Sequence, residues 1–365
     1  MPTPKRVVST IAIIIALYLV NAFMSKEGLF GFGFGAYPTD VLMTLTINII
    51  LAVSLNLITG FTGQFSIGHA GFMAIGAYSS AYLVVYHAQF WERDLAGTVG
   101  FTVAHALIFV IAIAFGSLVA AFAGLLVGIP SLRLRGDYLA IVTLGFAEII
   151  RIVILNIDKV GGATGFSVPS YSNFIWVGGF AIISIVIVHN IVHSDIGRAL
   201  VSIREDELAA EAMGINTTRY KVLAFVISSA LAGLAGVLFG HYRSFLSTND
   251  FQFIRSFEII IMIVLGGMGS LTGAVLGAIV ITIMPELLRQ MPGDLSRYRL
   301  VVYSALLIVI ILTRPQGILG TREFSLSWLK RSRKRPEGAQ VVGGTGGVSI
   351  AEQEPSDSKK DRENR

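Results

Sequence analysis

Ten apolar segments, separated by short polar stretches, constrain this chain more than any other feature of its sequence. Apolar runs of about 20 residues are typical of transmembrane α-helices. Only 14% of the residues are charged, whereas soluble domains carry about 25%. We therefore predict an all-α, polytopic transmembrane helical bundle of about ten spans, and not a soluble enzyme. The segments are 7–24, 41–59, 66–87, 104–128, 138–155, 174–192, 222–241, 257–268, 270–285 and 300–313.

Two of these segments, 257–268 and 270–285, are short, and a glycine-rich break from Gly266 to Ser270 separates them. Irregular backbone at membrane depth is tolerated only where protein shields it or where it lines water. The sequence leaves open whether this stretch forms two short spans or a re-entrant segment. A single span here would reduce the total to nine and place the two termini on opposite sides of the membrane.

Both termini are expected to be cytoplasmic, although the loops do not decide this. Outside the C-terminal tail, a ten-span arrangement puts eight Lys and Arg residues on each side. The orientation therefore depends on the eleven basic residues after the last span, because basic residues are enriched on the cytoplasmic side. The run from Lys330 to Arg335 either flanks that span as a stop-transfer signal or contacts anionic membrane lipid.

The chain divides into three parts. Residues 1–40 hold the first span and an external loop, residues 41–320 hold the main helical domain, and residues 321–365 form a basic, then disordered, cytoplasmic tail. The first span follows Lys5 and Arg6 and is expected to remain uncleaved. A signal peptide cleaved near Ala22 is the alternative.

Polar groups and glycines cluster at the short connection between the segments 41–59 and 66–87. An unpaired polar group at membrane depth is costly, so these side chains either bond locally within packed helices or face water and substrate along a glycine-lined pathway. The glycines of the later break are candidates for the same pathway. The candidate residues are Asn56, Gly63, Gln64, Ser66, His69, Gly266 and Gly267.

Sites for catalysis are not expected. The chain has no cysteine, which excludes Cys-based metal sites and nucleophiles. It has no phosphate-binding Gly-x-x-x-x-Gly-Lys-Ser/Thr motif and no set of His, Asp and Glu with metal-ligand spacing. Glu148 and Arg151 are helical neighbours inside one predicted span, where they either neutralise each other or serve a function. No catalytic residue, metal or cofactor is therefore assigned.

A charged stretch from Ser194 to Asn216 interrupts the apolar sequence. Ser202 is expected to cap a helix that runs through Met213, with acidic residues in its first turns and Gly214 as its stop. The small face of Ala209 and Ala210 suits insertion into a groove on another protein. The alternative, an amphipathic linker lying on the membrane, is disfavoured because its early charges are acidic.

One motif in the charged stretch stands out, the pattern Glu207-x-Ala209-Ala210-x-x-x-Gly214. Further distinctive motifs are Gly197–Leu200, Ile203–Glu207, Ala209–Asn216, Tyr220–Lys221, Gly68–Met73, Asp137–Phe146, Gly266–Ser270 and Arg314–Gly317. The first pattern resembles the coupling signature of ABC importer permeases, with Leu208 as an extra residue. Together the motifs resemble the branched-chain amino acid permeases of ABC importers, LivM type, over about residues 40–320.

The resemblance implies a transport subunit of the bacterial inner membrane, not an enzyme. Such a subunit pairs with a homologous second permease, two cytoplasmic ATPase subunits that bind ATP, and a periplasmic amino-acid-binding protein; nucleic acid is not a partner. It imports leucine, isoleucine and valine by alternating access. The ATPase-coupling residues implied are Ser202, Glu207, Ala209, Ala210 and Gly214.

Three alternatives remain at this stage. An importer of the same architecture could carry urea, short amides or other amino acids, because Gly161–Gly165 departs from the Gly-Gly-Pro-Asn-Gly common in the family. A stand-alone secondary transporter or channel would need a coupling-ion site, for which Glu148 and Glu258 are the buried acidic candidates. A membrane-anchored interaction protein is disfavoured by ten spans rich in small residues.

Overall fold

The computed structural model describes residues 36–88, 100–131, 137–290 and parts of 301–320. Each apolar segment predicted between residues 41 and 285 corresponds to a helix. The segment 7–24 lies outside the described residues, as does much of 300–313. The helices are α2 (Ala36–Asn56), α3 (His69–Leu83), α5 (Phe101–Ser131), α6 (Asp137–Leu155), α7 (Phe174–Val192), α10 (Thr217–Arg243), α11 (Phe253–Gly266) and α12 (Leu271–Gln290).

Six of the described helices are long and apolar enough to cross a membrane: Tyr37–Phe61, Val103–Ser131, Tyr138–Leu155, Phe174–Val192, Thr217–Arg243 and Leu271–Arg289. The prediction of a helical membrane bundle is confirmed at this level. The structure adds one feature that the sequence does not predict: two short strands, β1 (Phe166–Ser167) and β2 (Phe245–Leu246), pair antiparallel. Backbone hydrogen bonds between two connecting loops are enough to form such a pair.

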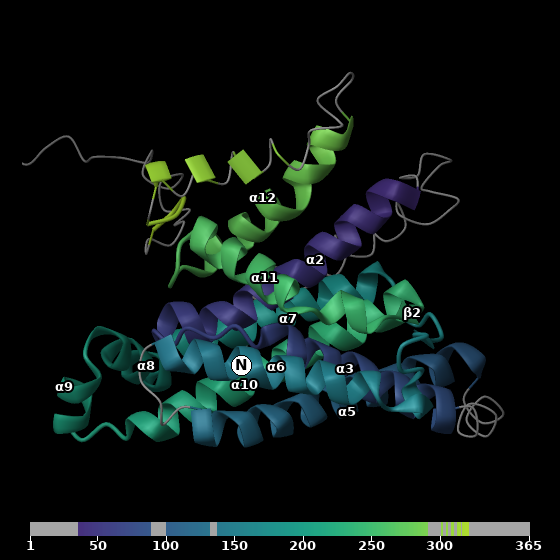
Figure 1. Cartoon of the computed structure of the whole chain (residues 1–365), viewed down its shortest axis with the longest axis horizontal. Helices are drawn as coiled ribbons and strands as arrows, with labels where there is room; N and C mark the ends of the chain where they lie inside the picture. The colour runs from purple at the N-terminus through teal and green to yellow at the C-terminus, as the bar shows by residue number, and fades with distance from the viewer. Residues whose placement is uncertain are drawn as a thin grey trace, which may run out of the picture. The chain divides into compact units, whose positions relative to one another are not determined.

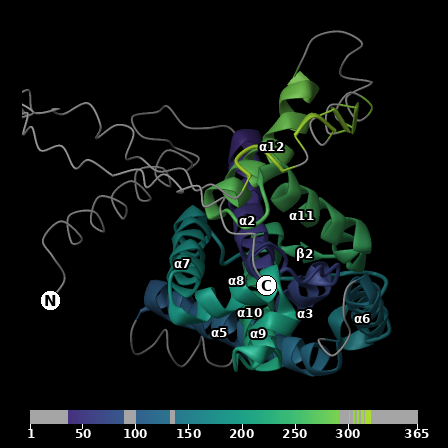
Figure 2. The same cartoon turned by 90° about the vertical axis from the view of Figure 1, so that its left-hand side faces the viewer.

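Helix α10 packs against α3 and α5 in the centre of this bundle (Figure 1). Glycines make the approach possible: a Cβ on Gly236 would lie 1.9 Å from the carbonyl oxygen of Met73, and one on Gly76 would lie 2.1 Å from that of Gly233. Small residues let helix backbones approach closely inside a membrane. Figure 2 shows α10 in the middle of the group, with α7 on one side and α6 on the other.

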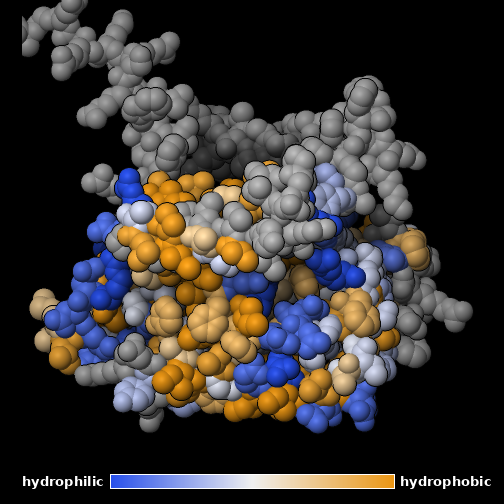
Figure 3. Space-filling view, turned by 45° about the horizontal axis from the view of Figure 1, so that its top comes forward, coloured by the Kyte–Doolittle hydropathy of each residue, from blue (hydrophilic) through white to orange (hydrophobic). Residues whose placement is uncertain are grey.

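Large apolar side chains are exposed on the outer helices. They include Leu118 and Phe122 on α5, Ile141 and Ile149 on α6, and Ile183 on α7. Figure 3 shows broad hydrophobic areas on the surface of the described part. An apolar surface of this extent is unusual for a soluble monomer and suits contact with lipid or another membrane subunit.

The bundle has two distinct ends (Figure 1). One end holds the short helices α8 (Asp195–Glu205) and α9 (Glu207–Ala212), and the other holds the β1–β2 pair. Near the β1–β2 end, the Tyr242 hydroxyl donates to Asp40 Oδ1 at 3.0 Å and the Tyr86 hydroxyl donates to the Lys159 carbonyl at 2.8 Å. The segments joined there all lie on the side that the ten-span arrangement predicts to be external.

Candidate functional site

The charged stretch forms two helices, α8 and α9, and not the single helix predicted from Ser202 to Met213. Ser202 lies inside α8, where its hydroxyl donates to the Arg198 carbonyl at 2.9 Å. The cap of α9 is Asp206, whose Oδ1 accepts from the amides of Leu208 and Ala209 at 2.9 and 3.1 Å. The prediction of Ser202 as the cap is therefore wrong. Asp206 has extended backbone (φ −156°), which separates the helices and aims its carboxylate at the free amides of α9.

The predicted stop at Gly214 is confirmed. Its φ of +86° lies in the left-handed region that favours glycine. The Gly214 amide donates to the Glu211 carbonyl at 2.9 Å, and the Ile215 amide donates to the Ala210 carbonyl at 3.0 Å. This pair of bonds is the Schellman motif, which satisfies carbonyls at a helix end.

The predicted coupling residues of α9 face in two directions. Glu207 turns toward α10 and pairs with Lys221 at 2.6 Å, where the Lys221 side chain is only 6% exposed. Ala210 is buried, whereas Ala209 is exposed. Leu208 on α9 and Met213, the residue that follows α9, are 61% and 83% exposed. Two large apolar side chains are thus exposed at this end of the bundle.

Arg204, at the end of α8, connects this unit to the bundle. Its Nη1 donates to the Gly60 carbonyl at 3.0 Å, and its Nη2 pairs with Glu205 at 2.7 Å. Gly63 lies against the same side chain, since a Cβ there would be 2.8 Å from Arg204 Cγ. Leu200 and Ile203 are buried and hold α8 in place. Sequence reasoning did not single out Arg204, because its partner is 144 residues away.

Gly60 belongs to a second contact, between the two glycine-rich breaks. Asn56 accepts from the Gly269 amide and donates to the Ser270 carbonyl, both at 3.0 Å. A Cβ on Gly60 would lie 1.9 Å from Asn56 Oδ1 and 2.4 Å from the Gly269 nitrogen. We call the segments 56–63 and 266–270 the glycine junction. Asn56 and Gly60 thus join the two glycine-rich breaks directly, and the other pathway candidates Gly63, Gly266 and Gly267 belong to the two segments that meet there.

The chain after the last predicted span also reaches the glycine junction. The Ile318 amide donates to the Leu265 carbonyl at 2.8 Å, and the Leu319 amide donates to the Gly266 carbonyl at 3.2 Å. These bonds satisfy carbonyls at the end of α11, where Gly267 has a φ of +117°. The residues that directly follow the motif Arg314–Gly317 are thus hydrogen-bonded to the backbone at the glycine-rich break.

The remaining pathway candidates are buried within this chain. His69 Nε2 lies 2.7 Å from Ser54 Oγ, in a fully packed environment. Ser66 and Gln64 are buried as well, and Gln64 Oε1 has no hydrogen-bond partner among the described residues. The contacts of His69 match the local-bonding interpretation. Its role in a pathway stays a prediction.

The two acidic residues that the sequence offers as coupling-ion candidates are both paired. Glu148 Oε2 accepts from Arg151 Nε at 2.8 Å, and Glu258 Oε2 accepts from Arg255 Nη1 at 2.7 Å. Their side chains are 28% and 46% exposed in this chain. The prediction that Glu148 and Glu258 are buried is therefore wrong within this chain, most clearly for Glu258. Glu258 lies on a side of α11 that the described residues leave open.

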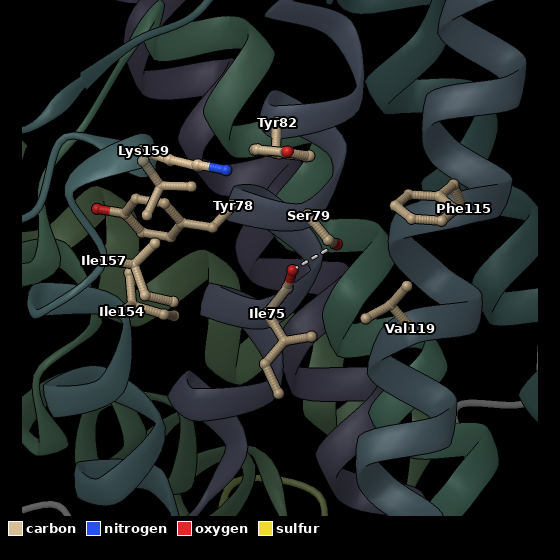
Figure 4. Close-up of a pocket in the computed structure, with 10 residues that line it drawn as sticks. Ile75, Tyr78, Ser79, Tyr82, Phe115, Val119, Ile154, Ile157 and Lys159 are labelled. Atoms are coloured by element: carbon tan, nitrogen blue, oxygen red, sulfur yellow. Dashed lines mark hydrogen bonds between the residues drawn. The ribbon is translucent and has the colours of Figure 1, made fainter. Parts of the chain in front are cut away.

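An apolar groove of about 450 Å³ opens between α3, α5 and α6 (Figure 4). Its walls include Ile75, Tyr82, Phe115 and Ile154, and Figure 4 places Lys159 at the upper left, near Tyr78 and Tyr82. Among the described residues that line it, Lys159 is the one charged group. The groove contains no candidate from the sequence. A cleft of this composition suits an apolar chain and offers few groups for orienting a polar ligand.

Comparison with known proteins gives a consistent result. Residues 37–311 match the family model "Branched-chain amino acid transport system / permease component". The high-affinity branched-chain amino acid transport system permease protein LivM of Salmonella typhimurium is 35% identical over 318 residues, covering 77% of this chain and 69% of that protein.

Two further relatives extend the match. A branched-chain amino acid transport permease protein LivM of Methanocaldococcus jannaschii is 24% identical, covering 76% of this chain and 92% of the relative. The LivH permease protein of Salmonella typhimurium is 35% identical over 167 residues, covering 45% of this chain and 53% of LivH. Since the family model matches residues 37–311 of 365, this chain belongs to the permease components of branched-chain amino acid transport systems.

Proposed function

We propose that this chain is the membrane-spanning permease subunit of an ATP-driven importer that carries leucine, isoleucine and valine into the cytoplasm. The observation that supports this most directly is the family match over residues 37–311. The named relatives LivM and LivH are both permeases for branched-chain amino acids. The chain acts as a transport subunit, and separate subunits bind and hydrolyse ATP.

The subunit crosses the inner membrane of a bacterium about ten times, with both termini in the cytoplasm. Six spans follow from helix length and composition. The shorter helices α3 and α11, with the segments 7–24 and 300–313, complete the count. Loop contacts support the topology: Arg204, Gly60 and Gly269 meet at one end, and the topology puts all three on the cytoplasmic side. The loops 166–167 and 245–246, which it puts outside, pair with each other.

Helix α9 is the element that docks on the ATPase. Its exposed face, with Leu208, Ala209 and Met213, fits a groove on a partner in the way an amphipathic helix binds. Glu207 and Ala210 hold α9 against α10. Gly214 ends α9, so that the end of this helix remains exposed. Ser202 stabilises α8, which carries Arg204. The coupling residues thus divide into those that dock and those that hold the docking helix.

Motion of α9 reaches the membrane through α8. A rigid shift of α8 moves Arg204, and Arg204 is bonded to Gly60 in the glycine junction. Left-handed glycines at Gly267 and Gly269 let the backbone change direction there. Opening and closing of the junction would then alternate access to a pathway between this subunit and a homologous second permease. A periplasmic binding protein delivers the amino acid to that pathway.

Reconstitution tests this proposal. The chain is placed in proteoliposomes with its partner permease, two ATPase subunits and the periplasmic binding protein, and uptake of radiolabelled leucine is measured with and without ATP. We expect uptake that requires ATP and every component. Uptake by the chain alone, without ATP, would indicate a secondary transporter or channel. ATP-dependent uptake of urea or an amide in preference to leucine would assign the other substrate class.

A further inference from the structure

A second polar cluster, far from the glycine junction, lies at mid-membrane depth on α11. The Arg255 guanidinium donates to Asn48 Oδ1 at 2.6 Å and to Glu258 Oε2 at 2.7 Å. Asn48 in turn donates to Thr282 Oγ1 at 2.8 Å. One network thus joins α2, α11 and α12.

The helices themselves give the depth of this network. Asn48 stands eleven residues after the start and thirteen before the end of the apolar span Tyr37–Phe61. Thr282 stands eleven residues after the start of the span Leu271–Arg289. At about 1.5 Å of rise per residue, both side chains lie near the centre of a hydrocarbon core about 30 Å thick. The Arg255 guanidinium, bonded directly to Asn48, lies near the same depth, which differs from the ten-span prediction that residue 255 precedes the span 257–268 on the external side.

The two charged groups of this cluster are open on one side. The Glu258 side chain is 46% exposed and the Arg255 side chain is 19% exposed, while Asn48 is buried. Glu258 bonds through one carboxylate oxygen, and Arg255 Nε is not engaged among the described residues. Ionisable side chains inside a membrane rarely face lipid and mark substrate paths. This pair therefore has capacity for a ligand on a surface that another subunit would have to cover.

We infer that Arg255 and Glu258 form a transient site for the zwitterionic backbone of an amino acid within the translocation pathway. Arg255 binds the α-carboxylate, and Glu258 binds the α-ammonium group. Asn48 is a positioning residue, because it holds the guanidinium at this depth. The inference rests on the proposed function, which supplies an amino acid as the substrate.

Charge balance favours this ligand over an ion. The Arg255–Glu258 pair is neutral overall, and an amino acid zwitterion is neutral too. When the amino acid binds, the Arg255–Glu258 ion pair is replaced by two ion pairs, one between Arg255 and the carboxylate and one between Glu258 and the ammonium group. No charge is therefore left unpaired at low dielectric. A bare anion or cation would leave Glu258 or Arg255 without a partner. Guanidinium groups also bind carboxylates with two parallel hydrogen bonds.

The neighbouring surface suits a branched apolar side chain. Ile254 and Phe257 are 54% and 39% exposed on α11. Ile254 lies four positions before Glu258, so these two side chains share a helix face, and Phe257, three positions after Ile254, extends the apolar surface beside it. The site thus offers two charges for the backbone of the substrate and apolar contact for its side chain. The Glu148–Arg151 pair on α6 has the same spacing and opposite charges, but no hydrogen bond or ion pair joins it to a second helix within the part of the chain that the structure describes.

Substrate analogues test the assignment of the two charges. The complete transporter, without its binding protein, is held in nanodiscs, and binding of radiolabelled leucine is competed with two analogues. The keto acid 4-methyl-2-oxopentanoate lacks the ammonium group, and 3-methylbutylamine lacks the carboxylate. For the wild type we expect saturable leucine binding at least about tenfold tighter than binding of either analogue, from the loss of one charge-assisted hydrogen bond.

Two variants should have reciprocal effects. Glu258→Gln should weaken leucine binding about tenfold, because the leucine ammonium group loses its carboxylate partner. It should not weaken binding of the keto acid, which has no ammonium group and no longer leaves a carboxylate unpaired. Arg255→Gln should likewise weaken leucine binding and should not weaken binding of the amine, which has no carboxylate. The matched variant Glu148→Gln removes the carboxylate of the Glu148–Arg151 pair. It should leave the affinities for leucine, the keto acid and the amine unchanged.

Failure of the site can be told apart from failure of the proposed function. ATP-dependent leucine uptake is measured on the same wild-type complex with its binding protein, and its absence would reject the proposed function. If uptake occurs, the site is rejected by any of three results. These are no saturable leucine binding, equal weakening of all three ligands in the variants, or loss of complex assembly in Glu258→Gln, which would indicate a purely structural ion pair.

Discussion

The guanidinium of Arg204 donates a hydrogen bond of 3.0 Å to the main-chain carbonyl of Gly60, 144 residues away in the chain. This bond joins the last turn of α8 to the end of the first described span. Because α8 precedes the exposed helix α9, Arg204 connects this pair of helices directly to the glycine junction, along the route by which we propose that the ATPase acts. Replacing the Arg204 side chain alone therefore tests whether motion of α9 is transmitted through α8 to the glycine junction.

Replacing Arg204 should uncouple ATP hydrolysis from transport. Arg204→Ala removes a charge-assisted hydrogen bond of about 1.5–3 kcal/mol, so we expect leucine uptake to fall about tenfold or more. Co-purification with the ATPase should be unchanged, because Arg204 lies behind the docking face. Uptake and ATP hydrolysis are measured in parallel on proteoliposomes. Arg198→Ala is the control on the same helix, since the Arg198 side chain is 73% exposed; equal losses in both variants would contradict the role of Arg204.

A methyl group on Gly60 should disrupt the glycine junction. The added Cβ would lie 1.9 Å from Asn56 Oδ1, which is overpacking that typically costs about 1–3 kcal/mol. We expect Gly60→Ala to lower the midpoint of thermal unfolding and to reduce uptake. Gly179→Ala on α7 is the control, because its Cβ would meet nothing within 4 Å. Unchanged unfolding and uptake in Gly60→Ala would show that the junction tolerates the methyl group.

A charge on the exposed face of α9 should prevent docking of the ATPase. Leu208 and Met213 are highly exposed, so Met213→Asp leaves the fold within about 0.5 kcal/mol of the wild type. It should nevertheless abolish co-purification with the ATPase subunit, since a charge is costly in an apolar groove. Thr218→Asp, at an exposed position on α10, should retain the complex. If the Met213→Asp variant co-purified with the ATPase subunit in the same yield as the wild type, the docking surface would lie elsewhere.

Breaking the Glu207–Lys221 pair should destabilise the α9–α10 contact. Glu207→Gln leaves the ammonium of Lys221, which is 6% exposed, without its counter-ion. We expect a loss of about 2 kcal/mol, less than the 3–5 kcal/mol of a fully buried pair, because Glu207 is 28% exposed. The double variant Glu207→Gln, Lys221→Met should recover most of that loss in thermal unfolding. Equal instability of the single and double variants would mean that the ion pair is not the cause.

Hydropathy predicted the positions of the helices well. The segments 138–155 and 174–192 agree with α6 (Asp137–Leu155) and α7 within one residue. The prediction was less accurate at α10, which begins at Thr217 and not at residue 222. Its first turns contain Lys221, a charge that a hydropathy pattern excludes from a span. The pairing of Lys221 with Glu207 makes that burial possible, and the pairing is a tertiary contact.

The helix boundaries within the charged stretch were only partly predictable. Gly214 was identified correctly because a left-handed helix stop is a local property of glycine. Ser202 and Asp206 are both favourable N-cap residues, so composition alone did not choose between them. The choice depended on where the backbone leaves the helix, and that is set by the packing of Leu200 and Ile203 beneath α8.

The sequence by itself determined where the long apolar helices lie, where glycines interrupt them, and to which family the chain belongs. These properties depend on local hydropathy, backbone preference and motif spacing. Tertiary structure alone decided that Arg204 meets Gly60, that Asn56 bonds to Gly269, and that Arg255 bonds to Asn48. The physical reason is that each contact joins residues more than 140 positions apart, and only the packing of helix faces against one another sets which side chains meet.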